Sequence, residues 1–195
     1  MTEKEERIEK LKKLVLQCSA CSLVQERPKM VFGDGSLNAI VMFLGEAPGK
    51  DEQKLGLPFV GRSGKLLRKM IAAIDIPIED FYIANIIKDR PPNNRIPEKE
   101  EIAACVKFLK KQIEIICPKF LVLLGKTAVK GLFPEHTRTP VDALRNSTKN
   151  LGFLTYEQLP AIVTYHPSAL LQAPWRKIGA AEDFKFIQAV YGRFK

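Results

Sequence analysis

Hydrophobic positions along the chain form four short runs that are separated by longer amphipathic stretches. The runs are Ala39–Leu44, Phe81–Ile87, Phe120–Leu124 and Ala161–Tyr165, and each is nearly continuous in apolar residues. Runs of this length and character are typical of strands that are buried on both faces of a parallel sheet. The pattern therefore predicts four buried strands.

The stretches between these runs carry apolar residues at helical spacing. The predicted helices are Gly64–Ile74, Glu98–Ile116, Lys126–Leu132 and Gly179–Phe194. The second of them has a clear start signal, because Pro97 suits a first helical turn and acidic residues follow it. Strands that alternate with helices favour a three-layer α/β/α sandwich around a central four-stranded parallel sheet. The length of 195 residues fits a single domain, 1–195.

Composition adds the class of protein and a first indication of its partner. A hydrophobic content of 46% is enough for a buried core, and no apolar stretch is long enough to span a membrane. The charged N-terminus is unlike a signal peptide, so we expect a soluble, cytoplasmic protein without a membrane partner. The formal charge of +9 favours a polyanionic partner, although basic proteins that do not bind nucleic acids are also common.

Candidate functional residues follow the predicted strands, because ligands of parallel α/β sheets bind at the carboxyl ends of the strands. Glu46 opens a long glycine- and proline-rich loop, residues 45–64, where a catalytic carboxylate would be held rigidly. Asn85 lies at the end of the second strand and offers a donor and an acceptor, although its position also fits an ordinary strand-end asparagine. His166 ends the fourth strand before Pro167, a position that fits a functional and a structural histidine equally well.

Three ordered motifs in the chain resemble those of a known family. They are GEAPG followed by GLPFVGRSG, the segment NIIK-x-RPPNNR-x-P, and HPS before a leucine-bearing loop. Together they strongly resemble the family 4 uracil-DNA glycosylases, the iron–sulfur branch of that superfamily, over nearly the whole chain. The resemblance implies a single uracil-DNA glycosylase-like domain. It also implies an enzyme that flips uracil out of single- or double-stranded DNA and hydrolyses the N-glycosidic bond. No lysine stands at a motif position suited to a Schiff base, so we expect a monofunctional enzyme that leaves an abasic site, and we expect it to be a monomer.

The resemblance also implies roles for individual residues around the uracil. The implied uracil-binding residues are Glu46, Ala47, Glu52, Phe59, Asn85 and His166. Phe59 is expected to stack on the base, and Asn85 to bind its N3–O4 edge. Glu46 and His166 are the expected catalytic residues: the first positions the attacking water, and the second donates to uracil O2. Glu52 is expected to help exclude the methyl group of thymine.

The loop after the fourth strand resembles the insertion loop of the family. The expected DNA-binding residues are Arg62, Ser63, Ser168, Leu170, Arg176 and Lys177. Leu170 is the expected wedge in the base stack, and the polar and basic residues are expected to contact or support phosphates.

The family pattern breaks at its cofactor site. The family holds a structural [4Fe–4S] cluster with four cysteines, and Cys18, Cys21 and Cys105 match three of them, but Asp89 stands at the fourth position. Three outcomes are open. Asp89 ligates iron through a carboxylate oxygen; or the cluster is incomplete, labile or absent; or the site recruits Cys117 or binds zinc instead.

Other functions of the same fold are weaker interpretations of the sequence. The main alternative is a DNA-binding or altered-base member of the superfamily that does not excise uracil. A cross-linking relative would need a nucleophilic histidine near residues 89–97, where this chain has none. A hydrolase of small molecules would leave the positive charge and the wedge-like loop unexplained.

Overall fold

The protein folds around one six-stranded sheet. The computed structural model describes residues 1–150 and 152–195. The strands are β1 (Asp34–Gly35), β2 (Val41–Gly45), β3 (Phe81–Asn85), β4 (Phe120–Leu124), β5 (Leu154–Tyr156) and β6 (Leu159–Thr164). Their order across the sheet is β1-β3-β2-β4-β6-β5.

The four predicted strands form the centre of this sheet and run parallel to one another. The sheet is nevertheless mixed rather than four-stranded, because β1 and β5 pair antiparallel at its two edges. These edge strands have two and three residues, and each of them is partly exposed. Strands this short carry no continuous apolar run, so the hydrophobic pattern does not reveal them.

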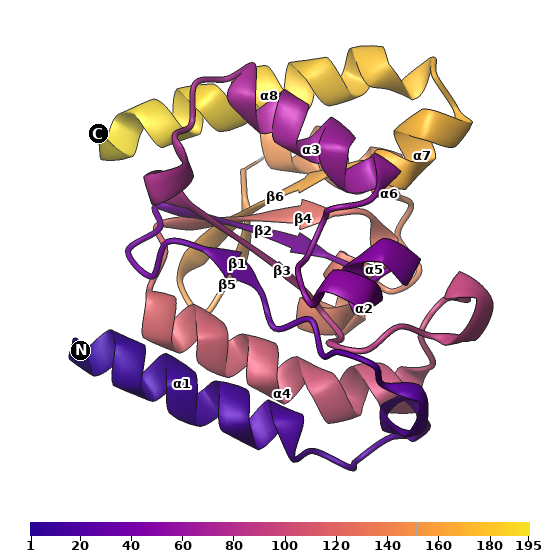
Figure 1. The fold of residues 1–195 in the computed structure, drawn as a ribbon. Helices are drawn as coiled ribbons and strands as arrows, with labels where there is room; N and C mark the ends of the chain where they lie inside the picture. Colours follow the sequence, from indigo (N-terminus) through magenta and orange to yellow (C-terminus); the bar gives the residue numbers. More distant parts are fainter. Residues whose placement is uncertain (151) are drawn as a thin grey trace.

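Helices cover both faces of the sheet and its carboxyl end. The α-helices are α1 (Glu3–Leu16), α2 (Lys50–Leu55), α3 (Arg62–Ala72), α4 (Lys99–Ile116), α5 (Lys126–Leu132), α6 (Val141–Asn150), α7 (Pro167–Gln172) and α8 (Arg176–Tyr191). Short 3-10 helices are η1 (Ser22–Glu26), η2 (Ile78–Asp80), η3 (Pro92–Asn94), η4 (Pro134–His136) and η5 (Gly192–Phe194). Figure 1 shows α1 and α4 side by side below the sheet and α3 and α8 above it. The predicted α/β/α sandwich is confirmed.

Side chains of the central strands alternate between two cores. On β4, Phe120 and Val122 pack toward α3 and α8, whereas Leu121 and Leu123 pack toward α4 and α5. All five residues of this strand are buried. Each central strand has a nearly continuous apolar sequence because both of its faces are covered, as the sequence predicted.

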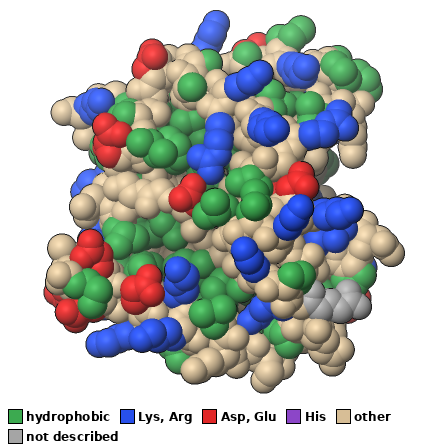
Figure 2. Space-filling model, in the orientation of Figure 1, with side chains coloured by type: hydrophobic (Ala, Val, Ile, Leu, Met, Phe, Trp, Pro, Cys, Tyr) green, Lys and Arg blue, Asp and Glu red, His purple; other side chains and the backbone are tan. Residues whose placement is uncertain are grey.

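Basic and acidic side chains are distributed unevenly over the face of the protein that Figure 2 shows. Figure 2 shows Lys and Arg side chains gathered over the right-hand part of this face, where α2 and α7 lie, and acidic side chains mainly at the lower left. Among the described residues, no helix is long and apolar enough to cross a membrane.

Candidate active site

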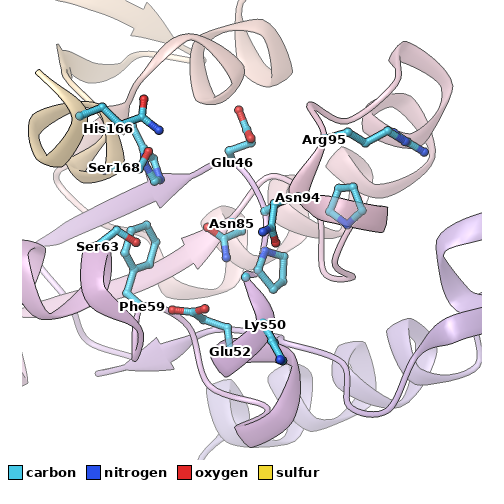
Figure 3. Close-up of a pocket in the computed structure, with 15 residues that line it drawn as sticks. Glu46, Lys50, Glu52, Phe59, Ser63, Asn85, Asn94, Arg95, His166 and Ser168 are labelled. Atoms are coloured by element: carbon cyan, nitrogen blue, oxygen red, sulfur yellow. The ribbon is translucent and has the colours of Figure 1, made fainter.

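A cavity of about 360 Å³ opens at the carboxyl ends of the central strands. Its lining includes all six predicted uracil-binding residues: Glu46, Ala47, Glu52, Phe59, Asn85 and His166. Figure 3 shows Phe59, Asn85 and Glu52 around one central space, with Glu46 and His166 above them and Arg95 on the far side. Residues that are up to 120 positions apart in the sequence are thus brought to one site, at the edge where parallel sheets bind ligands.

Asn85 forms the floor of this cavity. It is 2% exposed, and its Oδ1 alone, among the buried side-chain nitrogen and oxygen atoms of the described residues, has no hydrogen-bond partner. A buried acceptor without a partner costs free energy unless a ligand supplies the donor. The side chains of Asn85 and Phe59 have room in this arrangement because residue 45 is a glycine. An added Cβ at Gly45 would lie 2.5 Å from Oδ1 of Asn85 and 2.5 Å from the ring of Phe59. The floor is therefore shaped for a ligand with a hydrogen-bond donor on its edge.

A buried lysine, Lys88, binds the backbone carbonyl group of Asn85. The ammonium group of Lys88 donates to the carbonyl oxygen of Asn85 at 3.0 Å and to Oε1 of Gln112 at 2.6 Å. The Gln112 amide in turn donates to the carbonyl oxygen of Phe32 at 3.0 Å. Complete burial lowers the pKa of Lys88 to about 8. This network fixes the strand end from which the Asn85 side chain enters the cavity.

Phe59 reaches the cavity through a strained loop. Its φ of 53° lies in the left-handed region, and an added Cβ at Gly64 would lie 2.0 Å from its carbonyl group. Oε1 of Glu52 accepts hydrogen bonds from the backbone N–H groups of Val60 and Gly61, at 2.9 and 2.8 Å. Glu52 therefore has a structural role in placing the Phe59 ring, and its role against thymine stays a prediction.

Glu46 follows β2 directly and is oriented by a residue of α5, the helix that follows the neighbouring strand β4. The hydroxyl group of Thr127, a buried residue in the first turn of α5, donates a hydrogen bond to Oε2 of Glu46. This hydrogen bond fixes the orientation of the carboxylate through one of its two acceptor oxygens.

His166 is placed by the start of α7, where it is the N-cap residue. Its Nδ1 accepts from the backbone N–H of Ser168 at 3.2 Å and lies 2.7 Å from the Ser168 hydroxyl group. Because a backbone N–H can only donate, Nδ1 is unprotonated and the neutral ring carries its proton on Nε2. Burial lowers the pKa of His166 to about 4, so the ring is neutral at pH 7. The site thus offers a neutral donor next to Phe59, whose ring centroid is 5.7 Å away.

The predicted DNA-binding residues are divided between two places. Arg62, Ser63 and Ser168 line a second cavity of about 380 Å³ that shares Lys50, Glu52, Ser63, Ser168 and Gln172 with the first. Arg176 instead lies over the ring of Tyr165 at 5.4 Å, and Lys177 lines an apolar groove between α3 and α8. The structure therefore does not bring these two basic residues to the cavity.

Leu170 is not available as a wedge in this arrangement. It is 1% exposed and packs in a buried cluster with Tyr165 and Ala180, because α7 turns that side of the helix toward the core. The next residue, Leu171, is 38% exposed and lines the second cavity. The wedge role of Leu170 therefore stays a prediction that its burial does not favour, and the exposed leucine of this loop is Leu171.

The four predicted cluster ligands line one small cavity with Arg27. Cys18, Cys21 and Cys105 are partly buried free thiols, and Asp89 is buried. Both carboxylate oxygens of Asp89 accept from the Arg27 guanidinium, at 2.6 Å each. Within the described part of the chain, no group of three or more His, Cys, Asp or Glu side chains is arranged to hold a metal ion. The side chains as placed do not fit a cluster.

Reasoning from the sequence missed three residues that support this site from outside the cavity lining: Thr127, Lys88 and Gln112. Thr127 follows the third predicted strand by three residues, so the strand-end rule that found the other candidates also applies to it. Lys88 and Gln112 gave no such signal, because a lysine and a glutamine in charged segments are expected at the surface.

Most of the chain is similar to known proteins. Residues 32–191 match the family described as the uracil DNA glycosylase superfamily. The chain is 42% identical to a type-4 uracil-DNA glycosylase of Sulfurisphaera tokodaii, over 93% of this chain and 83% of the relative. It is 42% identical to a type-4 uracil-DNA glycosylase of Thermotoga maritima, over 88% and 87%, and 36% identical to one of Archaeoglobus fulgidus, over 92% and 90%.

Proposed function

Because the chain belongs to the type-4 uracil-DNA glycosylases of the uracil-DNA glycosylase superfamily, we propose that it excises uracil from DNA during repair. It hydrolyses the N-glycosidic bond between the base and its deoxyribose. The observation that carries this proposal is the unpartnered Oδ1 of Asn85, buried in a cavity that also presents Phe59, Glu46 and a neutral His166.

Recognition of uracil follows from the donors and acceptors of this cavity. The flipped base stacks on Phe59. Oδ1 of Asn85 accepts from uracil N3–H, and the Asn85 amide nitrogen donates to uracil O4. Cytosine lacks the N3 proton and carries an amine in place of O4, so it would leave both groups of Asn85 unpaired. A site built on such hydrogen bonds rejects the wrong base strongly, because its buried polar groups lose their partners.

In the chemical step, positive charge develops on the sugar and negative charge on the base, and a different residue of the cavity stabilises each. Glu46, oriented by Thr127, positions a water molecule against C1′ and stabilises the positive charge that develops on the sugar. As the C1′–N1 bond breaks, its electron pair moves onto the uracil ring, and Nε2–H of His166 donates to O2, where negative charge gathers. The water oxygen bonds to C1′, and its proton passes to Glu46. Uracil leaves as an anion and is protonated afterwards.

The enzyme is proposed to stop at the abasic site. Lys50 is the lysine of the cavity lining, and Figure 3 shows its side chain at the rim, pointing away from Glu46 and Asn85. A lysine at this place does not reach C1′ to form a Schiff base, so strand cleavage by the enzyme is not expected.

The substrate is single- or double-stranded DNA, and the net charge of +9 supports binding of its phosphates. A monomeric state and a cytoplasmic location stay predictions, and sedimentation of the protein alone and with DNA tests the first.

No step of this mechanism passes through an iron–sulfur cluster.

A direct test uses a single-stranded oligonucleotide with one uracil. We expect strand cleavage at the uracil only after alkali, and no trapped product with borohydride, because the product is an abasic site. Matched oligonucleotides with cytosine or thymine should stay intact. Glu46→Gln and Asn85→Ala should each lower the rate by about a hundredfold or more.

The alternative, a DNA-binding or altered-base member of the superfamily, makes a different prediction. In that case the oligonucleotide is bound but stays uncleaved, or a base other than uracil is released. A uracil-containing oligonucleotide that stays uncleaved in a folded preparation would contradict uracil excision.

A further inference from the structure

Arg27 and Asp89 form a buried ion pair at the place where the family resemblance puts a cluster ligand. Nε and Nη2 of Arg27 each lie 2.6 Å from a different oxygen of Asp89. Nη1 of Arg27 also donates to the carbonyl oxygens of Val15 and Leu16, at 3.2 and 3.0 Å. One guanidinium group thus connects the end of α1, the segment that follows it, and the segment after β3.

The space around this pair is nearly filled. The cavity that Arg27 and Asp89 line with Cys18, Cys21 and Cys105 has a volume of about 10 Å³. That volume holds about one water molecule at most. The Arg27 side chain, itself mostly buried, lines this small cavity together with the three thiols and Asp89.

The pair also competes with any use of Asp89 as a ligand. Both of its oxygens are engaged in charge-assisted hydrogen bonds, which are the stronger kind. For Asp89 to bind iron, Arg27 would lose its charged partner while it stays mostly buried, which is strongly unfavourable. The remaining thiols are three, one short of the usual cysteine set of a cluster.

We propose that this chain folds without an iron–sulfur cluster, and that the Arg27–Asp89 ion pair connects α1 to the segment after β3 in its place. The proposal does not depend on the proposed function, because none of its residues lines the uracil cavity.

The first experiment measures metal content. The full chain is purified anaerobically, incubated with ferrous iron and sulfide under reducing conditions, and then desalted. Iron, sulfide and zinc are determined per chain, together with the visible absorption of an iron–sulfur cluster. We expect no stoichiometric metal or sulfide, and a melting temperature that is unchanged by the incubation.

The second experiment compares two sets of variants by melting temperature. Arg27→Met and Asp89→Asn should each lower it by roughly 10 °C, because each leaves a buried group without its charged partner. The double variant Arg27→Met, Asp89→Leu should recover part of that loss, because an apolar pair carries no unpaired charge. The matched control replaces Cys18, Cys21 and Cys105 together by alanine, and should stay within a few degrees of the parent chain.

Clear results overturn the proposal. Cluster iron with sulfide, or stoichiometric zinc, in the parent chain would show that the site holds metal. A loss of stability in the triple cysteine variant that exceeds the loss in Arg27→Met would show that the thiols, not the ion pair, hold this region. Uracil excision is measured in the same preparations, so a failure of the proposed function is seen separately.

Discussion

The hydroxyl group of Thr127 donates a hydrogen bond to the carboxylate of Glu46, and so joins the segments that follow two neighbouring parallel strands, β2 and β4. Thr127 is buried, and its side chain lies outside the cavity lining. It therefore acts on the reaction through Glu46, as a positioning residue.

Replacing Thr127 by valine removes this hydrogen bond with little change in shape. We expect Thr127→Val to lower kcat by about 10- to 100-fold, the rate equivalent of one hydrogen bond to a charged group, with KM nearly unchanged. Thr127→Ser keeps the hydroxyl group and should restore most of the activity. Single-turnover rates on a uracil-containing oligonucleotide compare the two variants with the parent chain. A valine variant within twofold of the parent chain would contradict the positioning role.

The neutral state of His166 predicts how the rate depends on pH. The pKa of about 4 lies below the ordinary value of about 6.5, so the imidazole should show no titration step between pH 5 and 9. Below pH 5 the ring gains a proton on Nδ1 and loses its hydrogen bond from Ser168. Because the unfolded chain binds this proton first, the stability that a neutral His166 contributes is complete above pH 6.5 and is lost as the pH falls through 4.

The control for this prediction uses the only other histidine. In His136→Gln, the single remaining imidazole can be followed by NMR while kcat/KM is measured from pH 4 to 9. A titration of that imidazole near pH 6.5, or a matching step in the rate, would contradict a buried neutral His166.

Gly45 leaves room for Asn85 and Phe59, two residues of the proposed uracil pocket. A methyl group at this position would lie 2.5 Å from both Oδ1 of Asn85 and the Phe59 ring, which is closer than real side chains approach. We expect Gly45→Ala to lower kcat/KM by about a hundredfold, because both recognition groups must shift. Gly192→Ala is the matched control, since nothing lies within 4 Å of its added Cβ, and it should keep full activity. Equal activities of the two variants would contradict this account of the pocket floor.

The central sheet could be predicted from sequence because its strands are buried on both faces. Phe120–Leu124 and Lys126–Leu132 begin and end as predicted, whereas β2 begins at Val41 rather than Ala39 and β3 ends at Asn85 rather than Ile87. The helix α6, Val141–Asn150, escaped prediction because its residues are mostly polar and its packing on β6 is a tertiary effect.

The cavity at the strand ends could be predicted for the same reason, since Glu46 and His166 follow recognisable strands and Asn85 ends one. The partners of these residues depend on distant parts of the chain. The contact of Arg27 with Asp89 spans 62 positions, and that of Lys88 with Gln112 spans 24. No local pattern encodes such pairs, so the sequence does not reveal that Asp89 contacts a guanidinium group.

The leucines of α7 have separate roles, which one pair of variants distinguishes. Leu170 is buried, so Leu170→Ala should lower the free energy of unfolding by about 2 to 5 kcal/mol, as in other cores, and affect excision only through stability. Leu171 is 38% exposed beside the cavity that Arg62 and Ser63 line, so it is placed to enter a base stack. Leu171→Ala should therefore leave the melting temperature unchanged and slow excision from duplex DNA about tenfold. Excision from single strands, where no stack has to be opened, should change little. A Leu171→Ala variant that loses activity equally on both substrates would contradict the wedge, because the loss would then lie in uracil binding or chemistry.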